Sequence, residues 1–537
     1  MGEAVAKLSP DAKASKGIDP KGLRSYIFSR RTSELVIAFC GAVGSGVSTV
    51  AQEFKKLMED SRYGYRLERI KVSDLIEKAE PYLSDPVPEF MWPQATPNPR
   101  AKRTARLQDL GDALRYQFSY DALAVLAISE ISIKRAQGHL TEQVKEKIIK
   151  GEELPNENVR TIWLVDSLKN PEEVKTLRSI YGSMFYLIGV LSPFDVREGR
   201  LRKKGMSTSE AGIILDRDAS GSFDHGQKLV DTIHMADFFV NNAWETTANV
   251  TASLQRFISI LFGQLVPPTK EEYAMYVAQS AAYNSACLSR QVGAAVMAED
   301  GNIISYGYND VPKCGGGLYC SGDGPDNRCY ATPEKCRSES EKDTIKEKIK
   351  TILSSSSLKN EDVDAVLAVI YKESGIKNLT EFSKAVHAEM DAIIKVARRG
   401  TGGIEGCKMF VTTYPCHNCA KHIVAAGIKS VVYIEPYEKS LALKLHDDSI
   451  TSNPAAGEGK VKFIPFDGVA PRQFQNFFVI HGERKEKEEV LRTPPNEVFP
   501  ISDKFRDSFQ FYEAKAIQSL METPLSGILQ PEQGDKK

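Results

Sequence analysis

Short apolar runs, each the length of one buried strand, alternate with helical stretches in the first half of this chain. Three such runs cover residues 34–40, 161–166 and 184–190. Strands that are apolar throughout are typical of parallel sheets, because helices cover both faces of such sheets. The alternation of strands and helices therefore predicts a parallel α/β unit over residues 34–250.

The second half of the chain continues the alternation. We expect a helix first, then a hairpin that turns at Glu299-Asp-Gly, and then two strands that are each preceded by a helix. This order predicts a second α/β unit over residues 265–480. Its expected strands cover residues 292–297, 302–306, 408–413 and 430–435.

Three segments stand apart from these two units. A polar insertion over residues 312–382 interrupts the second unit. Residues 1–33 are rich in Lys, Ser, Gly and Pro and lack apolar periodicity, so they are predicted to form a flexible N-terminal segment. Residues 481–537 are charged and weakly patterned, and they are interpreted as a C-terminal extension.

The length and charge of the chain exclude several classes of protein. Its 537 residues suffice for several domains of about 100–200 residues each. The 70 Lys and Arg residues balance 71 Asp and Glu residues, which excludes a strongly basic nucleic-acid coat. We find no signal peptide and no apolar run of about 18 residues, so we expect a cytoplasmic protein outside any membrane. Nine cysteines in such a chain argue against a disulfide framework.

Two short motifs carry the strongest chemical signal. The run His-Ala-Glu at 387–389 is followed 26 residues later by Pro-Cys-His-Asn-Cys at 415–419, and each motif is expected to open a helix. One imidazole and two thiolates form a zinc ligand set that leaves the fourth tetrahedral position open for water. Glu389 lies beside this set, where its carboxylate can carry protons. The motifs predict a catalytic zinc site, with a purely structural zinc site as the alternative. The predicted ligands are His387, Cys416 and Cys419.

His-x-Glu followed by Pro-Cys-x-x-Cys is the signature of zinc-dependent nucleobase deaminases. The segments at 387–393 and 412–420 resemble the cytidine deaminase superfamily, and most nearly its deoxycytidylate deaminases. The runs Arg290-Gln-Val-Gly-Ala-Ala-Val and Gly307-Tyr-Asn-Asp add to this resemblance. The resemblance implies a cytidine-deaminase-like α/β/α domain, a Zn²⁺ cofactor and a catalytic Glu389 that transfers protons while the cytosine ring loses its amino group.

By the same resemblance, three residues are candidates for substrate contacts. Asn309 would hydrogen-bond the sugar or the base, and Arg290 and Lys313 would contact the phosphate. Asparagine is also intrinsically suited to turns, so a purely local role for Asn309 stays open.

Four cysteines in the insertion are candidates for a second metal site. Some deoxycytidylate deaminases carry a second, structural zinc ion in this part of the fold, which makes ligation an implication of the resemblance. The spacings between these cysteines are wider than the tight pairs of common zinc ribbons, so unliganded thiols are the alternative. The residues are Cys314, Cys320, Cys329 and Cys336.

A strand, a glycine-rich turn and a helix start occupy residues 35–49. The run nearly matches the phosphate-loop pattern G-x-x-x-x-G-K-[ST], in which backbone N–H groups surround a phosphate and the hydroxyl ligates Mg²⁺. Val47 stands where the pattern has lysine, so phosphoryl transfer is expected to be inefficient. This predicts a P-loop, nucleotide-kinase-like unit that binds a nucleoside triphosphate with Mg²⁺; a scaffold without turnover is the alternative. The candidate nucleotide-binding residues are Gly41, Gly44, Gly46, Ser48 and Thr49.

The complete layout resembles the bacterial antiviral deoxycytidylate deaminases, which join an N-terminal P-loop domain to a C-terminal deaminase. Membership of that family implies deamination of free dCTP and dCMP to dUTP and dUMP, which depletes deoxycytidine nucleotides during phage replication. It also implies a homo-oligomer that an inhibitory small RNA restrains in some members.

Two other functions compete with this interpretation. The first is a polynucleotide deaminase that acts on RNA or single-stranded DNA, which would need a basic groove. The second is a regulatory protein in which the P-loop unit senses nucleotides and the deaminase half is inert. The balanced charge disfavours the first, and the intact zinc motif disfavours the second.

Overall fold

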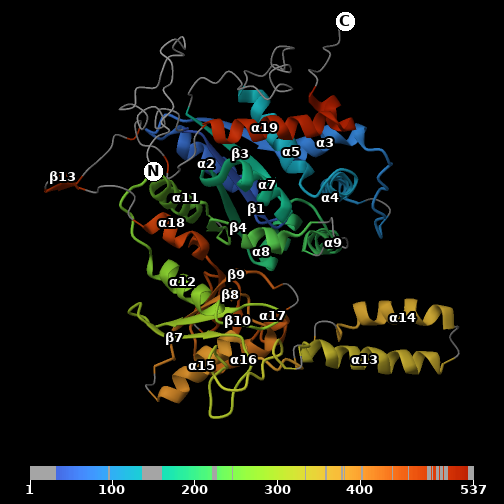
Figure 1. Cartoon of the computed structure of the whole chain (residues 1–537), viewed down its shortest axis with the longest axis vertical. Coiled ribbons are helices and arrows are strands. Elements are labelled where there is room, and N and C mark those ends of the chain that lie inside the picture. Colours follow the sequence, from blue (N-terminus) through green and yellow to red (C-terminus); the bar gives the residue numbers. More distant parts are fainter. Residues whose placement is uncertain are drawn as a thin grey trace, which may run out of the picture.

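Two six-stranded sheets organise the chain in the computed structural model, with the first unit above the second in Figure 1. Residues 1–31 of the predicted flexible segment lie outside the described part of the chain. The structure describes residues 32–94, 97–135, 160–219, 227–244, 246–332, 334–356, 360–376, 379, 381–400, 403–437, 440–457, 459–479, 485, 486, 488–490, 495, 500 and 506–529.

The first sheet has the strand order β12-β5-β4-β1-β3-β2, and its strands from β5 to β2 are parallel. Every residue of β1 and β4 is buried, as expected for central strands between layers of helices. The predicted parallel α/β unit is thus confirmed. Its parallel strands are β1 (Leu35–Gly41), β2 (Arg66–Lys71), β3 (Thr161–Leu168), β4 (Phe185–Leu191) and β5 (Phe238–Asn241).

Helices fill the connections between these strands. Their starts follow local sequence signals: in α7, Pro171 occupies the first turn, the Asn170 side chain accepts from the N–H of Glu172, and the Glu173 carboxylate accepts from the N–H of Asn170. The helices are α2 (Val47–Glu59), α3 (Val72–Ala79), α4 (Pro99–Gln117), α5 (Ala122–Arg135), α7 (Pro171–Tyr181), α8 (Phe194–Lys203), α9 (Thr208–Ala219), α10 (Leu229–His234) and α11 (Ala248–Leu261).

The second sheet is mixed, with the order β10-β11-β9-β8-β6-β7. Strand β6 runs antiparallel to both of its neighbours, β7 and β8, and the remaining pairs are parallel. The predicted hairpin is β6–β7. The elements are α12 (Lys270–Ala282), β6 (Gly293–Met297), β7 (Ile303–Tyr308), α15 (Ala388–Arg399), β8 (Lys408–Thr413), α16 (His417–Ala425), β9 (Ser430–Glu435), α17 (Ala442–Leu445), β10 (Ile450–Thr451) and β11 (Val461–Pro465).

Two glycines allow helices to lie directly on the second sheet. A Cβ atom at Gly293 would lie 1.8 Å from the carbonyl oxygen of Ala278 in α12, and one at Gly307 would lie 2.2 Å from that of Ala388 in α15. Close-packed interiors do not admit such overlaps, so a side chain at either position would push the helix away. The glycine in β7 therefore sets how closely the start of α15 approaches the sheet.

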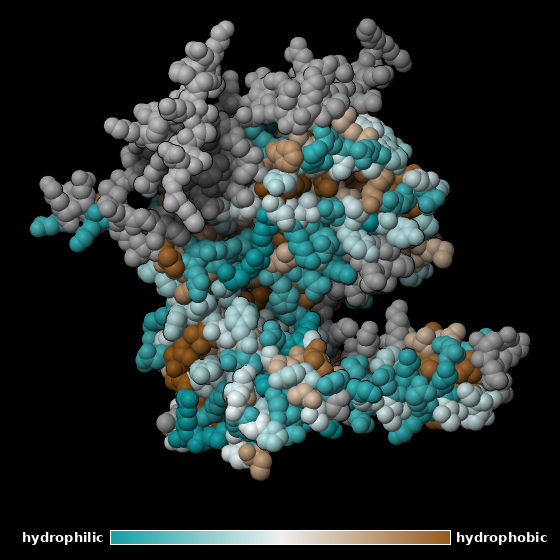
Figure 2. Space-filling model, viewed as in Figure 1, coloured by the Kyte–Doolittle hydropathy of each residue, from teal (hydrophilic) through white to brown (hydrophobic). Residues whose placement is uncertain are grey.

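The insertion forms a helical arm that projects from the second unit (Figure 1). It consists of α13 (Arg337–Ser354) and α14 (Asn360–Glu373), which pack against each other. Figure 2 shows apolar side chains toward the outer part of the arm. Ile352 of α13 and Val369 of α14 are exposed. The base of the arm, by contrast, adjoins the candidate site.

After the second sheet the chain returns to the first unit. Strand β12 (Gly468–Val469) pairs antiparallel with β5, and α19 (Arg506–Met521) packs against α5 and α7. The expected extension at 481–537 thus includes a helix that packs on the first unit through buried residues such as Phe509, Ile517 and Leu520. The other elements here are α18 (Phe474–Phe478), β13 (Lys485–Glu486) and β14 (Glu489–Val490).

The two units share one apolar core. The cluster that contains β1 and β4 also includes Met275 of α12, Phe410 of β8 and Ile434 of β9. Phe239 of the first unit packs edge-on against Phe466, which follows β11, with ring centroids 6.0 Å apart. In the described part of the chain, no helix is both long and apolar enough to cross a membrane.

A buried ion-pair network fastens α19 to the first unit. The Arg135 guanidinium lies 2.9 Å from Glu34 Oε2 and 2.5 Å from Glu513 Oε2. The Tyr181 hydroxyl donates to the second oxygen of Glu513 at 2.7 Å. Because these side chains are almost fully buried, each charge depends on its partners for compensation.

Replacing Glu513 by alanine is expected to lower the free energy of unfolding by about 3–5 kcal/mol, because a buried guanidinium and a buried hydroxyl each lose a partner. Urea unfolding followed by circular dichroism would measure the change. Lys515→Ala, on an exposed position of the same helix, is the control and is expected to leave the midpoint unchanged. Equal midpoints for Glu513→Ala and the unaltered protein would contradict the prediction.

Candidate active site

Three predicted ligands meet at the starts of two helices. His387 is the N-cap of α15, Cys416 is the N-cap of α16, and Cys419 lies in the first turn of α16. His387 Nδ1 lies 3.4 Å from Cys416 Sγ and 3.3 Å from Cys419 Sγ. Within the described residues, this is the one group of three or more His, Cys, Asp or Glu side chains whose ligand atoms all lie within 4.8 Å.

The donor set suits Zn²⁺. One imidazole nitrogen and two sulfurs are ligands that zinc accepts in tetrahedral geometry, and a set of three leaves one position for water or substrate. Cys416 and Cys419 are 6% and 1% exposed, so the ion would be held in a largely buried place. Among the described residues, no fourth His, Cys, Asp or Glu joins the group. The prediction of three protein ligands therefore agrees with the arrangement.

The three side chains differ in protonation, and only Cys416 already has the deprotonated form that a metal ligand needs. Hydrogen bonds from Cys419 and His387 lower the pKa of Cys416 to about 4, which makes it a thiolate. The hydrogen bond to Cys416 raises the pKa of His387 to about 9. Cys419 donates to Cys416, so its own pKa is raised. A bound cation would replace the protons of Cys419 and His387, so binding releases protons.

Glu389 lies one residue inside α15 and is 4% exposed. Burial raises the pKa of its carboxyl above the ordinary value, and the carboxyl interacts with the thiol of Cys419. The helix start thus carries a metal ligand and a buried acid two residues apart. An acid of this kind can hold a proton at a higher pH than an exposed glutamate does.

A cavity of about 330 Å³ opens beside these residues. One wall is the start of α15 and the end of β8, and the opposite wall comes from the two ends of the insertion. The base of α13 contributes Glu339 and Lys342, and the chain that leads into His387 contributes Lys384. The predicted site residues that line the cavity are Arg290, Asn309, Cys329, Cys336, His387, Glu389 and Cys416.

Asn309 supports the cavity wall through backbone contacts. Its side-chain oxygen accepts from the N–H of Val292 at 2.7 Å, and its side-chain nitrogen donates to the carbonyl of Arg290 at 2.8 Å. Asn309 is 7% exposed. These bonds hold the segment that carries Arg290. They are backbone contacts of the kind expected if Asn309 has a purely local, structural role.

Lys313 does not reach the cavity. Its ammonium pairs with Asp323, with Nζ 2.8 Å from Oδ2, inside the insertion. The phosphate contact expected of Lys313 was an implication of the family resemblance. Asp323 neutralises the charge of Lys313 within the same loop, so this ammonium is compensated without a bound phosphate.

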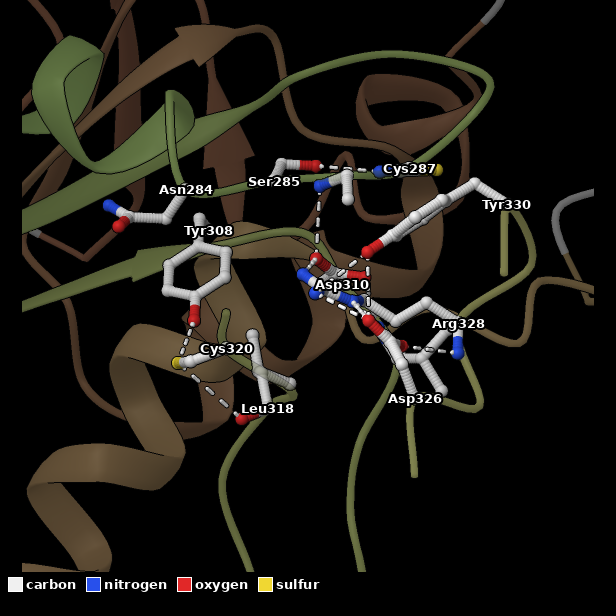
Figure 3. Close-up of polar contacts among 12 residues, drawn as sticks. Asn284, Ser285, Cys287, Tyr308, Asp310, Leu318, Cys320, Asp326, Arg328 and Tyr330 are labelled. Atoms are coloured by element: carbon white, nitrogen blue, oxygen red, sulfur yellow. Dashed lines mark hydrogen bonds and ion pairs between the residues drawn. The ribbon is translucent and has the colours of Figure 1, made fainter. Parts of the chain in front are cut away.

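The four cysteines of the insertion are not brought together as one ligand group among the described residues. Cys320 Sγ lies 3.3 Å from the Tyr308 hydroxyl, as Figure 3 shows, whereas Cys336 Sγ lies 3.9 Å from Ser289 Oγ. The second metal site therefore stays a prediction.

Two buried contacts near the cavity were missed by the sequence interpretation. The first joins Asp310 to Arg328: these side chains are 1% and 3% exposed, and Arg328 also pairs with Asp326 (Figure 3). The Asp310 carboxylate accepts from the N–H of Ala286 at 3.0 Å, which anchors the cavity rim. The second involves Glu435 at the end of β9, whose carboxylate accepts from Thr413 at 2.7 Å. Neither contact has a local sequence signal, because the partners come from distant segments.

The glycine-rich turn after β1 adopts the backbone that its glycines permit. Gly44 and Gly46 have φ angles of 83° and 86°, and α2 starts directly after Gly46. The hydroxyl of Ser48 donates to Asp166 Oδ2 at 2.9 Å, whereas Thr49 is exposed. Ser48 thus lies next to an acidic side chain at the carboxyl end of β3.

A lysine from another segment lies beside this turn. Lys169 Nζ lies 2.8 Å from the carbonyl oxygen of Gly41 and 2.9 Å from Asp218 Oδ1. The other oxygen of Asp218 accepts from the N–H of Val43 at 2.6 Å. The turn therefore already binds one carboxylate of the chain, with a lysine adjacent. The sequence had no signal for Lys169, because it is far from the turn along the chain.

The fold and the ligand set together define a zinc-dependent deaminase of the cytidine deaminase type. The family described as "Cytidine and deoxycytidylate deaminase zinc-binding region" matches residues 268–435, which leaves the first unit outside the match. The deoxycytidylate deaminase of Enterobacteria phage T2 is 37% identical over 172 residues, which cover 32% of this chain and 82% of the phage protein. The chain belongs to the deoxycytidylate deaminase family.

Other deaminases are less similar in sequence. The deoxycytidylate deaminase of Homo sapiens is 27% identical over 199 residues, which cover 36% of this chain and 79% of the human protein. The solved structure of the dCMP deaminase from cyanophage S-TIM5 in complex with dCMP and dUMP is 20% identical, covers 37% of this chain and 99% of the phage chain, and has a TM-score of 0.22.

Metal analysis of the purified protein is expected to find a single zinc ion per chain, held by the three gathered ligands. Cys416→Ala removes one of two sulfurs and is expected to lose most of this zinc. Cys314→Ala is the matched control, because Cys314 is exposed and belongs to no ligand group among the described residues. Retention of zinc by Cys416→Ala, or its loss from Cys314→Ala, would contradict this assignment.

Proposed function

We propose that this protein removes the amino group of free deoxycytidine nucleotides by hydrolysis, converting dCMP and dCTP to dUMP and dUTP with release of ammonia. The observation that carries the proposal is the grouping of His387, Cys416 and Cys419 at the edge of a cavity that the buried Glu389 also lines. Membership of the deoxycytidylate deaminase family supports the choice of base and sugar.

The side chains divide the work of the reaction. His387, Cys416 and Cys419 would hold Zn²⁺, which supplies an activated water as nucleophile when bound. Glu389 accepts one proton from that water and donates it to the ring nitrogen, and it then transfers the second proton, from the new hydroxyl on the ring carbon, to the departing amino group. Its burial favours this role, because a carboxyl with a raised pKa holds a transferred proton more readily than an exposed glutamate does. One water is consumed, and one ammonia is released.

The walls of the cavity favour a free nucleotide over a polynucleotide. The cavity, at about 330 Å³, has the size of a site for one small molecule, and the base of α13 and the segment before His387 contribute to its lining. Arg290 lines the cavity with a side chain that is 51% exposed, and its guanidinium suits a phosphate group. A polynucleotide deaminase would instead need a long basic groove with stacking aromatic side chains.

Glu389→Gln is expected to lower the rate of dCMP and dCTP deamination by at least about a hundredfold, because the amide cannot carry protons. Chromatography of the nucleotides and an ammonia assay would measure the loss, and zinc content is expected to stay unchanged. Glu405→Gln, on an exposed residue of the same unit, serves as the control. Full turnover by Glu389→Gln would refute the assigned role, and conversion of cytosine in oligonucleotides alone would refute the substrate.

We further propose that the first unit is a P-loop domain that binds a nucleoside triphosphate with Mg²⁺ at Gly41, Gly44, Gly46, Ser48 and Thr49. The positive φ angles of two glycines, the helix start and the nearby Asp166 support this assignment. Lys169 provides an ammonium beside the turn, where Val47 replaces the usual lysine. The Asp218 carboxylate on the Val43 N–H would have to leave when a phosphate enters.

Ser48→Lys is expected to weaken binding of ATP with Mg²⁺ at least about tenfold, because a long cation then occupies the space of the metal and pairs with Asp166. Equilibrium dialysis would measure the affinity of the full-length protein. Lys55→Ala, further along α2, is the control. Equal affinities for Ser48→Lys and the unaltered protein, or no binding by either, would refute the P-loop proposal.

We also propose that this activity protects the cell against phage. Depletion of dCTP would deprive a replicating phage of a DNA precursor, and the resemblance of the whole layout to antiviral deaminases supports this role. Phage plating on bacteria that carry the unaltered chain or Glu389→Gln tests it. Protection that needs the glutamate agrees with the proposal, and equal plating on both strains opposes it.

A further inference from the structure

The first unit contributes a side chain to the support of the deaminase cavity. His234 is the last residue of α10, and its Nε2 lies 3.0 Å from Oε2 of Glu435 at the end of β9. Helix α10 belongs to the first unit, and β9 is a central strand of the second sheet. The contact therefore crosses the boundary between the two units.

Glu435 also contacts two residues of the cavity wall. Its side chain is only 3% exposed, and its Oε1 lies 2.5 Å from a terminal nitrogen of Arg290. Its Oε2 accepts from the Thr413 hydroxyl at 2.7 Å as well as facing His234. Arg290 and Thr413 both line the cavity that contains Glu389 and Cys416.

The position of His234 is set by buried contacts of the first unit. The carbonyl oxygen of Met235, the next residue, accepts from Arg178 at 3.0 Å and from Arg472 at 2.7 Å. Arg178 also pairs at 2.7 Å with Asp237, which is fully buried. Because these contacts hold the end of α10, His234 presents its ring to Glu435 from a fixed place.

The charges explain why Glu435 needs this partner. Burial alone would raise its pKa, and the hydrogen bond and charge of His234, together with the charge of Arg290, lower the pKa overall. With Oε2 engaged by His234 and Thr413, Arg290 contacts Oε1 through one nitrogen. Without His234, Oε2 would keep only the hydrogen bond from Thr413, and the carboxylate could turn about that bond to meet the guanidinium with both oxygens, since bidentate pairing is the stronger arrangement.

We propose that His234 is a positioning residue for substrate binding: it orients Glu435 so that Arg290 keeps N–H groups available for the anionic phosphate of the nucleotide. The proposal rests on the proposed function, because it assumes that the cavity binds a deoxycytidine nucleotide. It makes nucleotide affinity in the second unit depend on a side chain of the first unit.

His234→Ala is expected to raise the KM for dCMP by about threefold to tenfold, with kcat within about twofold of the unaltered enzyme. His234→Gln is expected to restore the KM, because its side-chain amide nitrogen can occupy the place of Nε2, whereas the shorter His234→Asn should behave like His234→Ala. Asp231→Asn, on an exposed position of α10, is the control for the helix itself. All variants are measured as full-length, zinc-loaded protein.

A double-variant cycle separates positioning from a general structural effect. Arg290→Ala is expected to raise the KM for dCMP, and adding His234→Ala should raise it no further, because His234 acts through Arg290. The KM for deoxycytidine, which has no phosphate, should be the same in His234→Ala and the unaltered enzyme. Absence of turnover in the unaltered enzyme would overturn the proposed function. The role of His234 would be overturned if the KM increases of the two single variants multiplied in the double variant, or if His234→Ala raised the KM for deoxycytidine as much as the KM for dCMP.

Discussion

The approach of the His387 imidazole to the sulfurs of Cys416 and Cys419 is the contact on which the rest of the site depends. All three donors lie at the starts of helices that rest on the second sheet, so their mutual distances are set by helix packing rather than by a loop. The glycine at 307 is part of this constraint, because any side chain there would displace α15. A displacement of about 1 Å is enough to spoil a metal site or a catalytic arrangement, which explains why the cavity is built on the most regular part of the unit.

The surroundings of the cavity also show that the two units are joined by extensive contacts. They share an apolar core, the chain returns from the second sheet to complete the first, and the Glu435 carboxylate connects Arg290 with His234. The insertion adds the opposite wall through the base of its arm. Residues from four distant parts of the chain therefore define the space around a single reacting group. A change in any of these parts would alter the shape or charge of that space.

The sequence was sufficient where the information lies within a few residues. Apolar runs predicted the central strands of both sheets, and two helix-start motifs predicted the metal ligands, because strand burial and ligand spacing are local properties. It was insufficient where partners come from distant segments. Lys313 carries a positive charge near a recognisable motif, but only the fold reveals that Asp323 neutralises it. Likewise Glu435 is an ordinary acidic residue in the sequence, and its importance depends on three partners that tertiary structure brings to it.

The pairing of β12 with β5 has a consequence for biosynthesis. While the ribosome is producing the second unit, β5 is the outer strand of the first sheet, and its backbone N–H and C=O groups lack the neighbour that Gly468 and Val469 later provide. Open strand edges recruit other strands and promote aggregation. The nascent first unit thus stays vulnerable until almost nine-tenths of the polypeptide has been translated, and a chaperone that shields this edge would match the period of greatest risk.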